Sequence, residues 1–277
     1  MRSLLFYAKE VSKKLPLPIY KILSRCFVSY QIPRHLFIET TKRCNFSCSY
    51  CPRHKSNEDM DFQLFKRIID QCSQRPMSFS LHLFGEPLLW PHFSDGLSYI
   101  RAKNKRHEIN ITTNGWFLDS YIDNIVKQCC NVIWSYHDGN ADSRISKETE
   151  KKLKTLNFRV RSFDGNVSER WKKWLEIREY HNYGGKINLS RYGVLNTVER
   201  YPCYHLWLAP AVSLTGKMLA CCADVDENLI IGDLTKNTIQ EIWKSQEIRK
   251  LRFEHLNKIY HSTCSKCDVW KTYPSLF

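Results

Sequence analysis

The sequence predicts an α/β fold: a partial barrel of six β/α units, followed by a small cysteine-rich domain built from a β-hairpin and a helix. Two observations lead to this prediction. Short β-rich runs alternate with helical runs from residue 35 to about residue 195, and the alternation breaks near Tyr201. Six units are too few for a closed eight-fold barrel, so an incomplete barrel is expected.

The elements follow from the spacing of apolar residues. The first helix, for example, carries Phe62, Phe65, Ile68 and Ile69 on one face. Strands are expected at His35–Thr40, Ser78–Leu83, His107–Thr112, Asn131–Ser135, Asn157–Phe163 and Lys186–Tyr192. Helices are expected at Asp61–Gln74, His92–Asn104, Ser120–Lys127, Ser146–Leu156 and Glu169–Tyr180.

Three regions are expected along the chain. Residues 1–34 form a basic extension, residues 35–200 the partial barrel, and residues 201–277 the smaller domain. In the last region, a hairpin-like stretch around Gly216 precedes an amphipathic helix that starts at Thr238.

Composition narrows the class of protein. The 277 residues are 43% hydrophobic, which excludes a wholly disordered chain, and the net charge is +14. Residues 1–34 lack the pattern of a secretory signal, and no transmembrane run is apparent. We therefore expect a cytoplasmic protein, in which an ordered pattern among the 12 cysteines indicates metal binding or catalysis.

One group of cysteines directly follows the first expected strand. Cys44, Cys48 and Cys51 form a C-x3-C-x2-C pattern in a loop where α/β barrels place their chemistry. Three thiolates suit an iron–sulfur cluster that keeps one iron open to a ligand. The alternative is a zinc site with His54 as the fourth ligand, although that pattern would crowd four tetrahedral ligands into eleven residues.

The C-x3-C-x2-C pattern, with Tyr50 before its third cysteine, resembles the signature of the radical S-adenosylmethionine (radical SAM) enzymes. The resemblance implies that Cys44, Cys48 and Cys51 hold a 4Fe-4S cluster whose fourth iron binds SAM. It implies reductive cleavage of SAM and abstraction of a hydrogen atom from a substrate.

Further motifs of the resemblance follow later strands in order. Gly85, Glu86 and Pro87 resemble the family's GGEP turn, which binds the SAM amino group, but Phe84 stands where that turn has its first glycine. Asn114 lies in a TNG ending, and Ser135 ends the fourth strand, where a polar residue often meets the SAM ribose. His137, two residues later, could approach the same site.

The second group of cysteines is Cys203, Cys221, Cys264 and Cys267. Their spacing resembles the SPASM auxiliary-cluster domain in its shortened form, the twitch domain, which implies one auxiliary 4Fe-4S cluster. A structural zinc site with the same four ligands is the alternative, and Cys222 could exchange roles with Cys221. The other cysteines are expected to be ordinary thiols.

The resulting hypothesis is a radical SAM oxidoreductase or modifying enzyme that acts on a sugar- or aminocyclitol-like small molecule or on a peptide. A low-potential donor such as flavodoxin or ferredoxin would supply electrons. The alternative is a basic zinc-binding protein that binds nucleic acid, but the basic residues are spread along the chain, which disfavours nucleic acid as a partner. Residues 1–34 could also contact a membrane surface.

Overall fold

A computed structural model describes residues 32–137, 141–177, 180–188 and 202–269. Its centre is a nine-stranded sheet with the order β6-β5-β4-β3-β2-β1-β7-β8-β9. The strands are β1 (His35–Ile38), β2 (Ser78–Ser80), β3 (Glu108–Thr113), β4 (Asn131–Ser135), β5 (Phe158–Ser162), β6 (Leu175–Ile177), β7 (Ala211–Val212), β8 (Lys217–Leu219) and β9 (Ile230–Asp233). The longer helices are α3 (Phe62–Asp70), α4 (Phe93–Lys103), α5 (Leu118–Lys127), α6 (Lys147–Leu153) and α9 (Gln246–Leu256). Short helices are η1 (Pro87–Leu89), η2 (Ala141–Arg144), η3 (Lys172–Trp174), α7 (His205–Leu208), α8 (Ile239–Trp243) and α10 (Ser262–Lys266).

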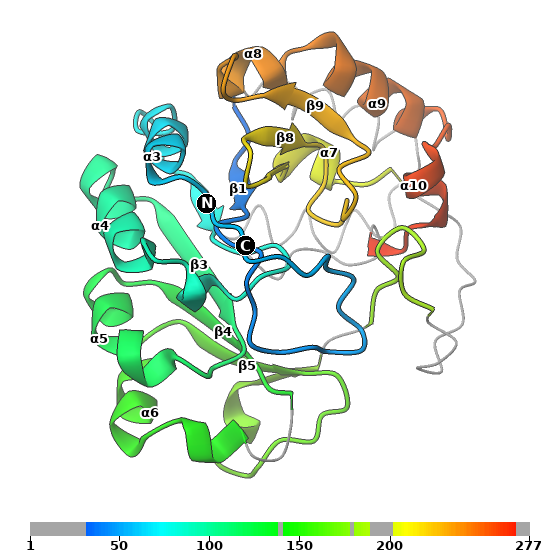
Figure 1. The fold of residues 1–277 in the computed structure, drawn as a ribbon. Helices are drawn as coiled ribbons and strands as arrows, with labels where there is room; N and C mark the ends of the chain where they lie inside the picture. The colour runs from blue at the N-terminus through cyan, green and yellow to red at the C-terminus, as the bar shows by residue number, and fades with distance from the viewer. Residues whose placement is uncertain (1–31, 138–140, 178–179, 189–201, 270–277) are drawn as a thin grey trace.

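The sheet confirms the expected partial barrel. Strands β1 to β6 pair in parallel with their neighbours, and α3, α4, α5 and α6 cover one outer side of them (Figure 1). Parallel strands joined by helices place all their carboxyl ends at one rim, where a site can form.

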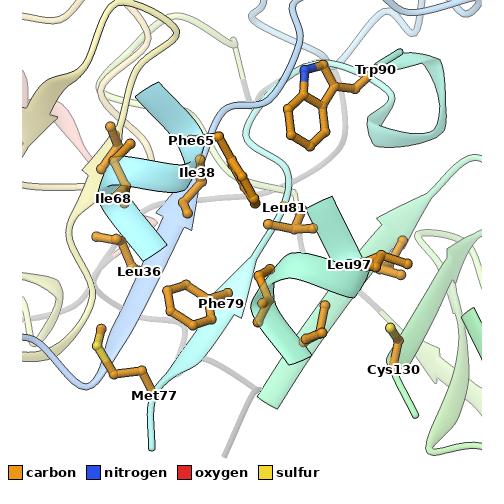
Figure 2. Close-up of a cluster of buried hydrophobic side chains, with 14 of the residues drawn as sticks. Leu36, Ile38, Phe65, Ile68, Met77, Phe79, Leu81, Trp90, Leu97 and Cys130 are labelled. Atoms are coloured by element: carbon orange, nitrogen blue, oxygen red, sulfur yellow. The ribbon is translucent and has the colours of Figure 1, made fainter. Parts of the chain in front are cut away.

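A hydrophobic core between β1, β2 and the helices holds this arrangement. Leu36 and Ile38 of β1 and Phe79 of β2 are fully buried against Phe65 and Ile68 of α3 (Figure 2). The Asp61 side chain caps α3 by accepting a hydrogen bond from the Leu64 amide. Burying each such side chain contributes about 2 kcal/mol, so this layer fixes β1 and the loop that follows it.

The opposite face of the sheet carries a row of polar side chains near the amino ends of the strands. The His35 ring meets the Ser78 hydroxyl at 3.0 Å, and the Asn110 amide donates to that hydroxyl at 2.8 Å. Asn131 donates to Asn110 at 2.9 Å, and Asn157 donates to Asn131 at 3.2 Å. Burial lowers the pKa of His35 to about 3, so the row is uncharged there. These bonds lock the register of five strands at the end remote from the cysteines.

The structure corrects two predictions. The helix expected at Glu169–Tyr180 is wrong: Lys172–Trp174 forms one short 3-10 turn, and Leu175–Ile177 forms β6, which pairs with β5. In place of the expected sixth strand, Lys186 lies in a turn, Ile187 in a bend and Asn188 in irregular structure, and residues 189–192 lie outside the described part. A short apolar run fits the periodicity of a helix and that of a strand. Leu175–Ile177 forms a strand because it pairs with β5.

The C-terminal region continues the same sheet. β7 pairs in parallel with β1, β8 is antiparallel to β7, and β9 is antiparallel to β8. The expected hairpin is therefore present, with Gly216 at φ +83° in its turn. The helix expected from Thr238 begins there with a capping box but is divided into α8 and α9. In the described residues, no helix has the length and apolar character needed to span a membrane.

Candidate active site at the carboxyl ends of the strands

Cys44, Cys48 and Cys51 lie in a partly buried loop, residues 44–51, which we call the cysteine loop. The Arg53 guanidinium holds this loop by donating to the backbone carbonyls of Lys42, Cys44 and Phe46. A turn closes between the Cys51 amide and the Cys48 carbonyl at 3.1 Å. Burial raises the pKa of Cys44 and of Cys48, and a neighbouring cysteine of the loop raises each further. A bound metal centre would lower these pKa values, because metal ions stabilise thiolates.

Gly85 and Glu86 bring the turn after β2 against the cysteine loop. A Cβ on Gly85 would lie 2.0 Å from the Thr41 carbonyl oxygen, so only glycine allows this approach. The Glu86 amide donates to the Arg43 carbonyl at 2.8 Å, and Pro87 starts η1. The turn is thereby held next to the residues that precede Cys44.

The Glu86 side chain is hydrogen-bonded to other groups of the protein. Its carboxylate accepts hydrogen bonds from the Leu88 amide at 3.2 Å, the Thr113 hydroxyl at 2.7 Å and the Asn114 amide at 2.8 Å. Burial raises its pKa to about 7, against these three hydrogen bonds, which lower it. The sequence suggested Glu86 as a cofactor contact, but its side chain joins the ends of β2 and β3.

Asn114 connects the end of β3 to the cysteine loop. Its side-chain amide donates to the Asn45 side chain at 2.9 Å and lies 4.0 Å from the Cys44 sulfur. The Trp134 indole donates to the Asn114 carbonyl at 3.1 Å and packs so closely on Gly115 that a Cβ there would lie 2.2 Å from it. The TNG ending is therefore fixed from both sides.

Tyr50 contacts aromatic side chains from other segments, whereas Ser135 lies at the end of β4. The Tyr50 hydroxyl hydrogen-bonds the His137 ring, and its own ring contacts those of Phe163 and Tyr180. Ser135 ends β4 in register with Arg161, and no described contact joins it to the cysteine loop. Phe163 and Tyr180 were missed, because nothing in the sequence indicates that the segment ending at Tyr180 returns to the cysteine loop.

The four C-terminal cysteines gather near one another. Burial raises the pKa of Cys203 well above its usual range, and the thiols of Cys221, Cys267 and Cys264 raise it further. Burial and Cys221 likewise raise the pKa of Cys267 to about 11. In the described residues, no three His, Cys, Asp or Glu side chains already stand in a metal-binding arrangement. The fit to a metal centre therefore rests on four neighbouring thiols, buried at Cys203 and Cys264 and half-buried at Cys221 and Cys267, which a bound cluster would stabilise as thiolates.

His54 does not complete a zinc site with the cysteine loop. Its ring pairs with the Asp226 carboxylate at 2.8 Å, and the side chain is 66% exposed. Lys186 binds the other oxygen of the same carboxylate. His54 thus links the segment that follows the cysteine loop to the turn after Cys222.

Comparison with known families accounts for this combination of sites. Residues 38–184 match the model of the radical SAM superfamily. This chain belongs to the radical SAM superfamily. Residues 203–268 match the model of an iron–sulfur cluster-binding domain, SPASM. The radical SAM enzyme therefore has SAM, a SAM-binding 4Fe-4S cluster and auxiliary iron–sulfur as its cofactors, and the zinc-binding, nucleic-acid-binding alternative is set aside.

Curated relatives of this radical SAM enzyme are distant. It is 22% identical to an S-adenosyl-L-methionine-dependent 2-deoxy-scyllo-inosamine dehydrogenase from Niallia circulans, over 78% of this chain and 84% of the relative. It is 23% identical to an uncharacterized protein from Treponema pallidum, over 76% of this chain and 68% of the relative.

Solved structures share the fold of this radical SAM enzyme. BtrN in complex with AdoMet and 2-DOIA matches with a TM-score of 0.67 and 20% identity, covering 86% of this chain and 93% of BtrN. Streptococcus suis SuiB bound to the precursor peptide SuiA matches with a TM-score of 0.62 and 14% identity, covering 89% of this chain and 72% of SuiB.

Proposed function

We propose that this radical SAM enzyme oxidises or otherwise modifies a small polar molecule, with Cys44, Cys48 and Cys51 holding the SAM-binding cluster. The observation that carries the proposal is the junction of the cysteine loop with the ends of β2 and β3 through Glu86 and Asn114. When bound, the cluster and SAM supply one-electron chemistry that removes a hydrogen atom from a substrate. A donor of the flavodoxin or ferredoxin class would provide the electron.

The residues around the cysteine loop have different roles in binding SAM. Gly85 allows the turn to approach, so the backbone of residues 85–87 is presented to the amino group of SAM. Glu86 holds that turn against β3 and acts on SAM through the backbone. Asn114 fixes the cysteine loop beside Cys44, and Tyr50 covers that loop together with His137. Ser135 is assigned to the ribose of SAM.

We further propose that Cys203, Cys221, Cys264 and Cys267 hold one auxiliary 4Fe-4S cluster. The thiols of the other three lie close enough to Cys203 to raise its pKa. Four thiolates complete the ligand set of such a cluster, which therefore serves electron transfer rather than substrate coordination. Cys222 packs against the small cluster of Phe37, Ala209, Ala211 and Leu219, and its sulfur lies 4.0 Å from the His205 ring and hydrogen-bonds the Cys221 thiol. We assign the ligand role to Cys221, whose thiol is among those that raise the pKa of Cys203.

A small-molecule substrate is favoured over a peptide. The chain covers 84% of the curated 2-deoxy-scyllo-inosamine dehydrogenase and 93% of BtrN, whose structure holds 2-DOIA, and this supports a small-molecule substrate. Peptide-bound SuiB and peptide-bound anSMEcpe share the fold, so a peptide is the second candidate.

The test is anaerobic purification and reconstitution, followed by measurement of iron, sulfide and zinc. Two clusters correspond to about eight irons per chain. With dithionite and SAM, the parent is expected to form 5′-deoxyadenosine. The triple variant Cys44→Ala, Cys48→Ala, Cys51→Ala is expected to form none, whereas Cys129→Ala, at an exposed cysteine remote from both groups, should match the parent. Stoichiometric zinc without iron, or SAM cleavage by the triple variant, would refute the proposal.

A further inference from the structure

Helix α9 lies on the outer side of the C-terminal region (Figure 1), and its inner face holds Cys203. The buried His255 ring on that face accepts a hydrogen bond from the backbone amide of Cys203 at 3.4 Å. One turn earlier, the buried Arg252 guanidinium donates to the Leu206 carbonyl at 2.8 Å. Because a helix is about 10–12 Å across, the outer face of α9 is one helix width away from a proposed cluster ligand.

The outer face of α9 exposes large apolar side chains. Phe253 lies one turn after Arg249 and is 65% exposed. Ile259, just beyond the end of the helix, is 56% exposed. A helix face that stays in water is normally polar. Two large apolar side chains exposed within seven positions therefore indicate an interaction surface.

The end of α9 brings Ile259 back toward Phe253. The Ile259 amide donates to the Glu254 carbonyl at 2.8 Å, and the Lys258 amide donates to the His255 carbonyl at 3.2 Å. These two bonds form a Schellman motif, in which the residue at the position of Ile259 packs against the last helical turn. The motif holds Lys258 at φ +61°, which costs a residue other than glycine about 1 kcal/mol. Strain of this kind is typical of binding surfaces.

Positive charge accompanies the apolar pair. Four exposed cations lie on α9 and at its two ends: Lys244, Arg249, Lys250 and Lys258. The same segment has two carboxylates, Glu247 and Glu254, and Glu254 lies 3.9 Å from Lys250. Among the described residues, no carboxylate pairs with Arg249. This surface is therefore complementary to an acidic partner.

An apolar pair within a basic surface favours an acidic protein over a nucleic acid. Interfaces with nucleic acids are more polar than those between proteins, whereas protein interfaces combine an apolar centre with a polar rim. The hydrogen bond between His255 and Cys203 indicates the kind of protein. Oxidation of a substrate removes two electrons, and the abstracted hydrogen atom carries only one of them. A carrier that takes up the second electron is needed near these cysteines.

We propose that the outer face of α9 and its ends, residues 244–259, which we call the α9 face, docks an acidic one-electron carrier protein of the flavodoxin or ferredoxin class. In the complex, one electron passes from the reduced auxiliary cluster to the oxidised carrier. The cluster is thereby oxidised, the carrier is reduced, and no bond forms or breaks. This inference rests on the proposed function, because it requires the auxiliary cluster.

The first test is isothermal titration calorimetry of the anaerobically reconstituted holoenzyme with an oxidised, acidic flavodoxin or ferredoxin. We expect binding that weakens as the salt concentration rises, because salt screens surface charges. Arg249→Glu and Phe253→Ala should each weaken binding about tenfold, since the first repels an acidic partner and the second removes apolar contact area. Arg75→Glu, at an exposed arginine after α3, and Ile177→Ala, at an exposed residue of β6, are the matched controls and should bind as the parent does.

The second test concerns the link to the auxiliary cluster. The triple variant Cys44→Ala, Cys48→Ala, Cys51→Ala keeps only the C-terminal group of cysteines. After reduction by dithionite and removal of the excess, it should reduce the carrier about as fast as the parent does in stopped-flow measurements. Adding Arg249→Glu should lower this rate about tenfold at subsaturating carrier, and saturating carrier should restore it.

Four results would overturn the inference. They are binding of neither carrier to about 1 mM, equal affinity of the parent, Arg249→Glu and Phe253→Ala, tighter binding of a single-stranded RNA than of either carrier, and loss of carrier reduction in a triple variant that retains its auxiliary iron. Iron content and dithionite-driven formation of 5′-deoxyadenosine test the proposed function separately, because neither requires a partner. Both should be unchanged in Arg249→Glu and Phe253→Ala.

Discussion

Glu86 binds the end of β3 directly: its Oε2 accepts a hydrogen bond of 2.8 Å from the backbone amide of Asn114. The other oxygen accepts from the Leu88 amide and the Thr113 hydroxyl. One buried carboxylate therefore joins the turn after β2 to the end of β3, next to the cysteine loop. The carboxylate is part of the scaffold that presents the backbone of this rim to SAM.

Replacement of Glu86 by alanine should cost stability and SAM affinity together. The variant leaves buried donors on Asn114 and Thr113 without their acceptor, which costs about 3 kcal/mol. We expect this loss in urea unfolding and a lower affinity for SAM in the reconstituted protein. Glu108→Ala, at an exposed glutamate at the start of β3, is the control. Equal stability of the two variants would show that the Glu86 bonds do not hold the rim.

Gly85→Ala tests the close approach of the same turn to Thr41, in the segment that follows β1. The new Cβ would lie 2.0 Å from the Thr41 carbonyl oxygen, and backbone on both sides must move. We expect a loss of about 3 kcal/mol or more in the free energy of unfolding. Gly165→Ala is the control, because a Cβ there meets Ile177 at 3.7 Å and only the positive φ of +72° adds strain. A Gly85 variant as stable as the control would contradict the steric argument.

The C-terminal cysteines can be tested independently of the first group. Cys264→Ser together with Cys267→Ser should remove about half of the iron, because these residues are ligands of one of the two proposed clusters. Formation of 5′-deoxyadenosine from SAM alone should continue, since the cysteine loop is unchanged. Retention of the parent iron content would show that these cysteines are not ligands.

Glu39 gives a pH dependence of stability. Burial raises its pKa to about 7, Glu227 and Glu58 raise it further, and Lys42 and the Leu214 amide lower it. Because the folded pKa lies above the ordinary value, the protonated carboxyl contributes stability that is complete below about pH 4.5 and lost as the pH rises through about 7. The free energy of unfolding of the parent, relative to Glu39→Gln, should thus fall by about 3 kcal/mol across this range.

The measurement is urea unfolding of both proteins at a series of pH values. A parent-minus-variant difference that stays constant between pH 4.5 and pH 7 would show that the pKa of Glu39 is not raised on folding.

The sequence was most informative where chemistry is local. Cys44, Cys48 and Cys51 are specified by spacing alone, and the strand before them is recognisable by its apolar residues. Gly85 and Asn114 were proposed as site residues from short motifs that follow their strands, and the structure places Gly85 against Thr41 and Asn114 near Cys44. The helix predicted over Glu169–Tyr180 failed because its apolar residues fit both a helix and a strand, and pairing of Leu175 with Val160 in β5 decided between them.

The sequence by itself therefore indicated the superfamily, the two groups of cysteines and the α/β order, because each shows in the spacing of residue types along the chain. Only the tertiary structure decided that the Glu86 side chain is bound within the protein and that His54 pairs with Asp226. It also placed the His255 ring against the Cys203 amide. These relationships join residues that are 28 to 172 positions apart, and the packing of a parallel sheet, rather than any local preference, brings such residues together.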